Sequence, residues 1–479
     1  MTRIVVGLLA SALFLSSVAV AAPAEQKLTF GRFGEVTVYR NSNEPKNMVL
    51  FVSGDGGWNL GVVSMAKTLA GLDATVVGID ITRFLRSIEN AKDACAYPAA
   101  DFEQLSQFVQ KKLGFQAFHR PVLVGYSSGA TLVYALLGQG PRGGSLGAIS
   151  LGFCPDLPTK RPWCKGFGLE DSKRPDGKTV DFSAIKTLTE PWYVMQGGQD
   201  QVCSPRVTAA FVAQVTNGHL ISMPNVGHGF SVERNWMPQF TNAFNQIIAS
   251  AKRPAPLRPI GKSATPASSS VGLSDVAKLP LVEIAATEGT SDTLAVLMSG
   301  DGGWAGLDRE VAARLAAKGI PVVGFDSLSY FWSKRSPDET AHAIEATLNH
   351  YLSAWQKQRV ILIGYSFGAD VMPFVVHRLP EGLQHRVRVM TLIVPSQSAE
   401  FEFHVAEWAG LNVGDTLPTL PEMQKAQGIN TLCIYGTEEK ESLCPKLVPL
   451  GAKVLALPGG HHAGGDYDRV VTEILTAAK

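Results

Sequence analysis

The chain carries the same series of motifs twice. SGDGGW follows an apolar run at Ser53 and again at Ser299, and VVG-x-D ends at Asp80 and again at Asp326. Both pairs are separated by the same interval along the 479-residue chain. A third pair, GYSSGA and GYSFGA, is slightly closer together, which indicates a few extra residues in the first copy. We therefore interpret the chain as a tandem duplication.

Short apolar runs alternate with segments of helical periodicity in both copies. Helices are predicted at residues 62–69, 102–113, 131–137, 236–249, 308–317, 338–355 and 469–477. Such alternation predicts a mostly parallel sheet with helices on both faces. Residues 28–48 are expected to add an edge hairpin. The predicted fold class is α/β, with two doubly wound domains that resemble α/β-hydrolases.

Composition divides the chain into four expected segments. Arg3, an apolar run and Ala19-Val20-Ala21 predict a secretory signal peptide at 1–21, with an uncleaved membrane anchor as the alternative. An N-terminal domain (22–250) and a C-terminal domain (279–479) flank a linker rich in proline and serine (251–278). The net charge of +1 gives no reason to expect a nucleic-acid partner.

The six cysteines fit an exported protein, because disulfides persist in oxidising compartments such as the periplasm. Zinc is the competing interpretation, but no C-x-x-C pair accompanies them, and we expect neither a metal nor a cofactor. The pairs in the first half are chosen by proximity in sequence. Cys433–Cys444 is the pair expected in the second half, and of the three pairings open to the other four cysteines we favour Cys154–Cys164 with Cys95–Cys203.

The third motif predicts a catalytic nucleophile. VILIGYSFGAD, residues 360–370, joins an apolar strand to G-x-S-x-G and then to a helical pattern. This order is typical of a nucleophile elbow, in which a tight turn exposes the serine hydroxyl. Ser366 is therefore the leading candidate, and Ser127 lies in the same setting in the first copy.

A serine nucleophile needs a histidine base and an acid that orients it. In the first copy, Asp200 and His228 follow two later apolar runs, which completes the candidate triad Ser127, Asp200 and His228. The order serine, acid, histidine is that of α/β-hydrolases. In the second copy, Glu439 stands at the position of the acid.

The histidine of the second copy has two candidates in the segment LALPGGHH. Alignment of Pro458 with Pro224 selects His462, whereas alignment of the two Gly-His pairs selects His461. We favour His462, because this choice requires no gap.

The SGDGGW loops are candidates for the oxyanion hole. A glycine-rich backbone beside the elbow can direct N–H groups at the developing oxyanion, together with the amide that follows the nucleophile. We assign Gly302 with Phe367 in the second copy, and Gly56 with Ser128 in the first. The alternative is a tight structural turn that glycine permits. The repeated Asp80 and Asp326 are expected to be loop or helix-capping residues, and they are not assigned to the site.

The motif set resembles the family of the bacterial virulence proteins VirJ and AcvB. SGDGGW, VVG-x-D, GYSFGADVMPF (364–374), GGHH and GDY (465–467) carry this resemblance. It covers residues 294–467 strongly and 48–230 in a more diverged form, and the two-copy layout is similar to AcvB.

The resemblance implies a periplasmic hydrolase that converts lysyl-phosphatidylglycerol, at the outer leaflet of the inner membrane, into phosphatidylglycerol and lysine. A cationic lysyl group favours acids near the pocket, and Asp301, Asp370 and Glu438 are candidates. Phe331 and Trp332 either meet the lipid or form a buried aromatic pair. The alternative function is a periplasmic scaffold of a secretion system, which uses hydrolase folds as binding surfaces for other proteins.

Overall fold

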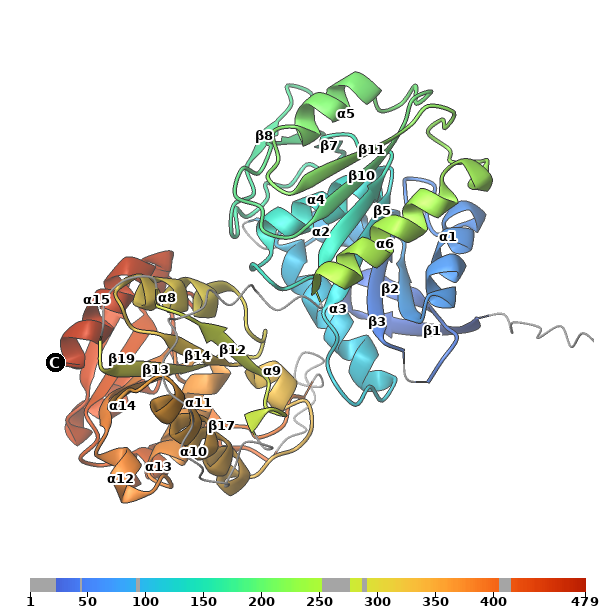
Figure 1. The fold of residues 1–479 in the computed structure, drawn as a ribbon. Coiled ribbons are helices and arrows are strands. Elements are labelled where there is room, and N and C mark those ends of the chain that lie inside the picture. The colour runs from blue at the N-terminus through green and yellow to red at the C-terminus, as the bar shows by residue number, and fades with distance from the viewer. Residues whose placement is uncertain (1–22, 44, 92–94, 252–275, 287–290, 405–414) are drawn as a thin grey trace, which may run out of the picture.

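A computed structural model describes residues 23–43, 45–91, 95–251, 276–286, 291–404 and 415–479. The predicted signal peptide and most of the predicted linker lie outside these residues. The described residues form two α/β domains, each built around its own sheet (Figure 1). No helix among them combines the length and the apolarity needed to cross a bilayer.

The N-terminal domain has an eight-stranded sheet in the order β1-β2-β4-β3-β5-β6-β10-β11. β1 and β2 form the predicted antiparallel edge hairpin, and from β4 onward all neighbouring strands are parallel. The strands are β1 (Ala24–Phe30), β2 (Gly34–Arg40), β3 (Asn47–Val52), β4 (Ala74–Ile79), β5 (Pro121–Tyr126), β6 (Gly147–Leu151), β10 (Trp192–Gly197) and β11 (Gly218–Met223), and a small sheet contains β7 (Asp156–Leu157), β8 (Asp171–Lys173) and β9 (Val180–Phe182). The helices are α1 (Leu60–Gly71), α2 (Ile81–Glu89), α3 (Pro98–Lys112), α4 (Ser128–Gln139), α5 (Pro205–Val212) and α6 (Met237–Ala251).

The C-terminal domain has a seven-stranded sheet in the order β12-β14-β13-β15-β16-β19-β20, in which only β12 runs antiparallel to its neighbour. The strands are β12 (Leu281–Ile284), β13 (Thr293–Met298), β14 (Val322–Phe325), β15 (Arg359–Tyr365), β16 (Val387–Ile393), β19 (Thr431–Gly436) and β20 (Lys453–Leu457), and β17 (Ser398–Ala399) pairs with β18 (Leu417–Pro418). The helices are α8 (Gly306–Ala317), α9 (Ser327–Tyr330), α10 (Pro337–Ala354), α11 (Phe367–Val376), α12 (Glu381–Gln384), α13 (Thr419–Lys425), α14 (Cys444–Leu447) and α15 (Tyr467–Ala477).

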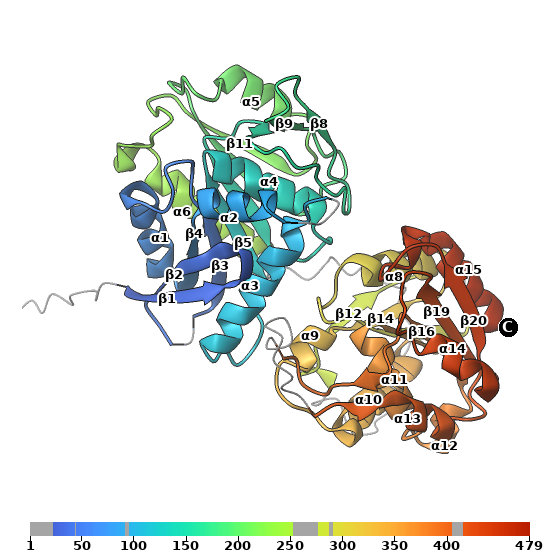
Figure 2. The ribbon, with the colours of Figure 1, turned by 180° about the vertical axis from the view of Figure 1, so that it is seen from behind.

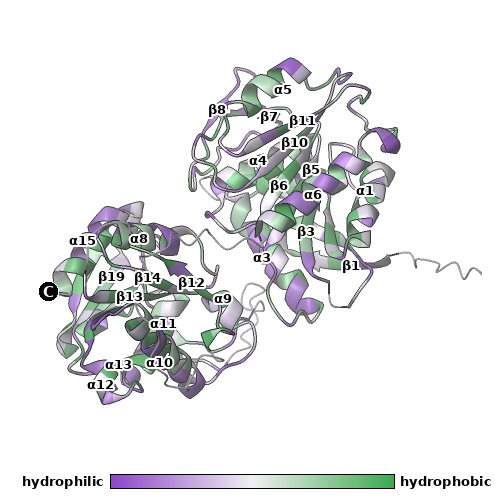
Figure 3. Cartoon of the chain, viewed as in Figure 1, coloured by the Kyte–Doolittle hydropathy of each residue, from purple (hydrophilic) through white to green (hydrophobic). Residues whose placement is uncertain are grey.

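The two sheets confirm the duplication and the doubly wound fold. The order β4-β3-β5-β6-β10-β11 corresponds strand for strand to β14-β13-β15-β16-β19-β20. Each sheet has a buried apolar cluster on both faces: α1 and α6 cover one face of the first sheet and α3 and α4 the other (Figures 1 and 2). In the second domain, α8 and α15 lie opposite α10 and α11. Figure 3 shows apolar residues concentrated along the central strands, as expected for strands covered on both faces.

Two of the repeated motifs form one packing unit. The indole of Trp304, from SGDGGW, lies directly over Gly324 of VVG-x-D, where a methyl group on the glycine would come within 2.5 Å of the ring. Trp58 covers Gly78 in the same way in the first domain. Each motif therefore provides the surface on which the other packs.

The aspartates of VVG-x-D cap the helices that follow. The carboxylate of Asp80 accepts hydrogen bonds from the backbone N–H groups of Thr82 and Arg83 at the start of α2. Asp326 accepts one from Ser329 at the start of α9. Both aspartates thus satisfy helix N–H groups that have no carbonyl partner within the helix, as predicted.

The disulfides confirm one predicted pair and correct the other two. Cys433–Cys444 is present, but the first domain contains Cys95–Cys164 and Cys154–Cys203, with Cα atoms 5.1 and 5.2 Å apart. The predicted pairs Cys154–Cys164 and Cys95–Cys203 are wrong because proximity in sequence does not set the distance in the fold. Parallel strands β6 and β10 are neighbours, so the loops at their carboxyl ends bring Cys154 to Cys203.

Candidate active site

Each G-x-S-x-G serine occupies a sharp strand-to-helix turn. Ser366 lies between β15 and α11 with φ 50° and ψ −118°, and Ser127 lies between β5 and α4 with φ 54° and ψ −123°. A positive φ is uncommon for a residue with a side chain and is typical of a nucleophile elbow. Side chains on Gly364 or Gly368 would collide with the backbone of Gly368 or of Met298, respectively. The two flanking glycines therefore allow the close approach that this turn needs.

Ser366, His461 and Glu439 lie in succession at the carboxyl ends of β15, β19 and β20, with a hydrogen bond between the first two and an ion-pair contact between the last two. His461 Nε2 lies 2.8 Å from Ser366 Oγ, and His461 Nδ1 lies 3.3 Å from Glu439 Oε1. The side chain of His461 is 47% exposed, so this serine–histidine pair is open to solvent. The geometry suits proton transfer from the serine hydroxyl to the imidazole.

The preference for His462 over His461 is corrected by this geometry. His462 Nδ1 instead lies 3.2 Å from the hydroxyl of Tyr365. The histidine follows Pro458 by one residue fewer than His228 follows Pro224, because Gly459 and Gly460 make a tighter turn in the second copy, with Gly459 at φ +98°. The alignment that matches His461 with His228 therefore requires a gap of one residue.

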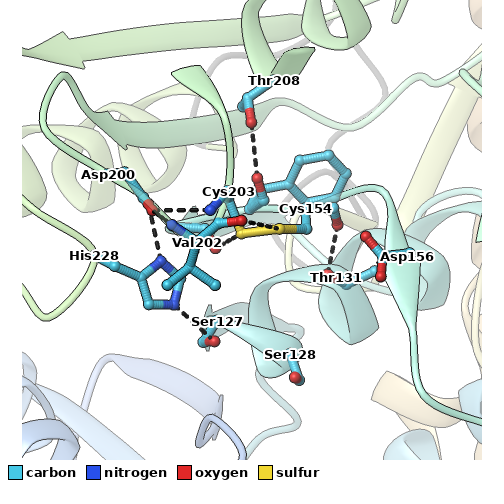
Figure 4. Close-up of a disulfide and its surroundings, with 12 residues drawn as sticks. Ser127, Ser128, Thr131, Cys154, Asp156, Asp200, Val202, Cys203, Thr208 and His228 are labelled. Atoms are coloured by element: carbon cyan, nitrogen blue, oxygen red, sulfur yellow. Dashed lines mark hydrogen bonds and ion pairs between the residues drawn. A yellow bond between two sulfur atoms is a disulfide. The ribbon is translucent and has the colours of Figure 1, made fainter. Parts of the chain in front are cut away.

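The N-terminal domain contains a hydrogen-bonded chain (Figure 4). Ser127 Oγ lies 3.0 Å from His228 Nε2, and His228 Nδ1 lies 2.9 Å from Asp200 Oδ2. The side chain of Asp200 is fully buried, and its Oδ1 accepts hydrogen bonds from the amides of Val202 and Cys203. This acid is held more firmly than Glu439, whose side chain is 30% exposed. Both copies thus have the arrangement required for a serine nucleophile.

A disulfide supports the acid of the first copy. Cys203, whose amide binds Asp200 at 2.8 Å, is joined to Cys154 in the loop after β6 (Figure 4). The disulfide therefore anchors the turn that orients the carboxylate toward His228.

Replacement of Cys154 and Cys203 by alanine is expected to lower the rate at which Ser127 reacts with a fluorophosphonate probe by about tenfold, because small displacements of catalytic groups are costly. Mass spectrometry of the labelled peptides would report Ser127 and Ser366 separately, and Ser366 should react at an unchanged rate. The matched control removes Cys95–Cys164 from the same domain. Equal slowing in both variants would contradict a specific role for the first disulfide.

The glycine loops lie beside the serines, as expected for an oxyanion hole. A methyl group on Gly300 would lie 3.4 Å from Ser366 Cβ, and one on Gly54 would lie 3.0 Å from Ser127 Cβ. Gly303 N–H also donates to the Gly300 carbonyl, so the loop is a tight turn. The tight-turn alternative and the oxyanion role are compatible.

The assigned oxyanion residues occupy distinct positions around these turns. The amides of Phe367 and Ser128 are the first of α11 and α4, where helical N–H groups have no carbonyl partner within the helix. Gly302 and Gly56 lie two residues beyond the glycines that touch the serines.

A buried aspartate that the sequence analysis missed lies beside the C-terminal glycine loop. Asp308 is at the start of α8, where the backbone N–H groups of Ala305 and Gly300 favour the charged form of its carboxyl group. It is 2% exposed, and burial raises its pKa well above the usual range. The only signal was a charged residue on the core-facing side of a predicted helix.

The three proposed substrate-binding acids have different surroundings. Asp301 is exposed within the glycine loop, and Glu438 is exposed beside the histidine loop, where its backbone N–H donates to the carbonyl of Gly459. Asp370 is only 9% exposed, and its Oδ1 accepts a hydrogen bond from the amide of Ser396. Burial and the charge of Asp301 raise the pKa of Asp370 well above its usual range. Asp370 thus binds the loop after β16, whereas Asp301 and Glu438 are accessible to a ligand.

Phe331 and Trp332 are both buried, as one of the two interpretations held, but they belong to separate apolar clusters. They are 1% and 3% exposed. Phe331 packs against Phe367 with ring centroids 4.9 Å apart, directly after the nucleophile.

A protein family described as "Bacterial virulence protein (VirJ)" matches residues 46–142 and 292–479 of the chain. The chain belongs to the VirJ family. The second segment contains Ser366, Glu439 and His461, whereas the first contains Ser127 and ends before the acid and histidine of its triad.

No curated protein matches this VirJ-family chain. Solved structures resemble about half of it. Est1E from Butyrivibrio proteoclasticus is 15% identical, with a TM-score of 0.32, over 48% of this chain and 100% of its own. An α/β serine hydrolase without lid from Xanthomonas campestris is 19% identical, with a TM-score of 0.31, over 50% and 98%. An α/β serine hydrolase homologue from Coxiella burnetii is 17% identical, with a TM-score of 0.30, over 48% and 98%.

Proposed function

We propose that this VirJ-family protein is a periplasmic serine hydrolase that cleaves the aminoacyl ester of lysyl-phosphatidylglycerol. The observation that carries the proposal is the set of contacts between Ser366, His461 and Glu439. These side chains lie at a nucleophile elbow inside the segment matched by the family. The substrate follows from the resemblance of the GYSFGAD, SGDGGW and GGHH motifs to the VirJ and AcvB proteins.

The reaction that fits these residues is acyl transfer. Ser366 Oγ attacks the carbonyl carbon of the lysyl ester while His461 Nε2 takes the hydroxyl proton. The amide of Phe367 and the glycine loop at Gly302 stabilise the oxyanion. His461 then returns the proton to the departing glycerol oxygen, which frees phosphatidylglycerol and leaves a lysyl ester on Ser366.

Water completes the cycle. His461 takes a proton from water, which attacks the lysyl ester on the serine, and the serine oxygen recovers that proton as lysine leaves. No step requires a metal or an external co-reactant. Glu439 keeps the imidazole in the required orientation and stabilises its protonated form.

The expected location is the periplasm, where the lipid substrate would be reached at the outer leaflet of the inner membrane. Three disulfides support export, because such bonds persist in oxidising compartments. The hydrogen bonds that join Ser127, His228 and Asp200 support a second catalytic unit in the N-terminal domain.

The test is release of lysine from vesicles that contain lysyl-phosphatidylglycerol. The purified protein should release lysine, and the Ser127→Ala/Ser366→Ala variant should lose release by at least about 10³-fold, as expected for loss of a nucleophile. Hydrolysis by this variant at the rate of the parent would contradict the triad mechanism. A parent protein that binds such vesicles without releasing lysine would favour a scaffold.

A further inference from the structure

A carboxylate of the N-terminal domain lies in the candidate active site of the C-terminal domain. Glu103 projects from α3 toward the SGDGGW loop of the second copy, where a methyl group on Gly302 would lie 2.8 Å from Glu103 Oε1. Figures 1 and 2 both place the lower end of α3 near α9 of the C-terminal domain. The two residues are far apart in sequence, so only the fold brings them together.

Packing between the domains anchors the carboxyl-terminal end of α3, the helix that carries Glu103. Trp332 Nε1 donates a hydrogen bond of 2.6 Å to the carbonyl of Phe115, just beyond the end of α3. Phe115 and Trp332 belong to one buried apolar cluster, together with Leu328 and Phe403. The helix that carries Glu103 is therefore fixed against the C-terminal domain by a buried contact.

The N-terminal domain also reaches the histidine loop of the same site. The ring of Phe167 packs edge-on against the ring of His462, with centroids 6.1 Å apart. His462 is the neighbour of His461. The first domain thus contacts the second site on two sides: at the glycine loop through Glu103 and at the histidine loop through Phe167.

Glu103 has no positive partner in the part of the chain that the structure describes. Among the described residues, its hydrogen-bond donor is the side-chain amide of Gln107, whose Nε2 lies 3.4 Å from Glu103 Oε1. No lysine, arginine or histidine of these residues pairs with it. Burial, together with the negative charge of Asp301, raises the pKa of Glu103 to about 8. Two neighbouring carboxylates without a cation are unfavourable, and a positively charged ligand would relieve their repulsion.

In the first copy, the aspartate at the corresponding position has a hydrogen-bond donor. There the carboxylate of Asp55, the counterpart of Asp301, accepts a hydrogen bond of 2.7 Å from Ser128. Phe367 replaces Ser128 in the second copy and has no donor in its side chain. Asp301 is consequently left available to act together with Glu103.

We propose that Glu103 is a specificity-determining residue of the C-terminal site, where its carboxylate, with that of Asp301, binds the ε-ammonium group of the lysyl ester. This inference rests on the proposed function. Glu103 enters from α3 of the other domain and meets the glycine loop at Gly302. Of the two ammonium groups of a lysyl ester, the ε-ammonium group lies at the end of a long side chain and can reach this carboxylate, whereas the α-ammonium group stays beside the ester carbonyl.

The test compares two esters that differ in the ε-ammonium group. We would measure kcat/KM for L-lysine p-nitrophenyl ester and L-norleucine p-nitrophenyl ester, using full-length protein with Ser127→Ala so that only Ser366 contributes. The Ser127→Ala/Ser366→Ala protein supplies the background rate. In this protein, Glu103→Gln should lower the ratio of lysine to norleucine kcat/KM by about tenfold, chiefly through KM, because a charge-assisted contact is lost.

The matched control is Asp101→Asn on the same helix. Asp101 pairs at 3.2 Å with Arg32 of its own domain, so its replacement should leave the ratio unchanged. An unchanged ratio in Glu103→Gln, with both esters still cleaved in a Ser366-dependent manner, would overturn the inference and leave the proposed esterase intact. Loss of the preference in both variants would equally overturn it, because a general disturbance of α3 would then be the cause. If neither ester is hydrolysed above the background by the Ser366-containing protein, the proposed function fails, and the assignment of Glu103 fails with it.

Discussion

Replacement of Ser366 by alanine is expected to lower lysyl-phosphatidylglycerol hydrolysis by at least about 10³-fold, because the proposed mechanism forms its covalent bond to this oxygen. The fold should be preserved, since among the described residues Ser366 Oγ bonds to the imidazole of His461 and to no core group. Lysine release from vesicles measures the effect. Alanine also tolerates the strained turn no worse than serine does, so the loss would be chemical.

The corresponding Ser127→Ala change separates the two copies. We expect it to retain most of the lysine release while it removes fluorophosphonate labelling from the N-terminal domain. The reason is that the family match covers the whole triad of the second copy but only the serine of the first. The reverse result, with Ser127→Ala inactive and Ser366→Ala active, would move the lipid-cleaving site to the N-terminal domain.

The paired histidines give the second prediction. His461→Ala is expected to reduce lysine release by about 10³-fold, because no other base lies within hydrogen-bond distance of Ser366 in the described residues. His462→Ala should reduce it by no more than about threefold, since this ring binds Tyr365 and Phe167 on the periphery of the triad. Steady-state kinetics of the two variants would decide between them.

The pH dependence of labelling offers an independent check on the base. Reaction of Ser366 with a fluorophosphonate should lose its acid limb in His461→Ala and keep it in His462→Ala, because only the base must be deprotonated to activate the serine. A greater loss of lysine release in His462→Ala than in His461→Ala would contradict the assignment.

The repeat made most of the fold predictable. Two copies of the same motifs, each with alternating apolar runs and helical segments, led to two parallel sheets with helices on both faces, and the order of the strands confirms it. The helices at 62–69, 102–113 and 338–355 lie within or almost within α1, α3 and α10. Periodicity was informative there because these helices place one face on a sheet.

Parts of the site depended on loop geometry, which periodicity does not report. One residue fewer after Pro458 turns His461 toward Ser366, and that gap is invisible to an alignment that minimises gaps. The predicted disulfide pairs were wrong for a similar reason, because the neighbouring strands β6 and β10 bring Cys154 close to Cys203. Glu103 could not be found at all, since a single acid on a predicted helix carries no sign that another domain will dock beside it.

The contact of Trp304 with Gly324, and of Trp58 with Gly78, has a consequence for recognising distant relatives. A larger residue at the glycine would displace the indole, and a smaller residue at the tryptophan would leave a cavity over the strand. The two positions should therefore change together or not at all. A search that requires both motifs, in the same copy and in this order, should separate true homologues from the many chains that contain G-x-S-x-G by chance.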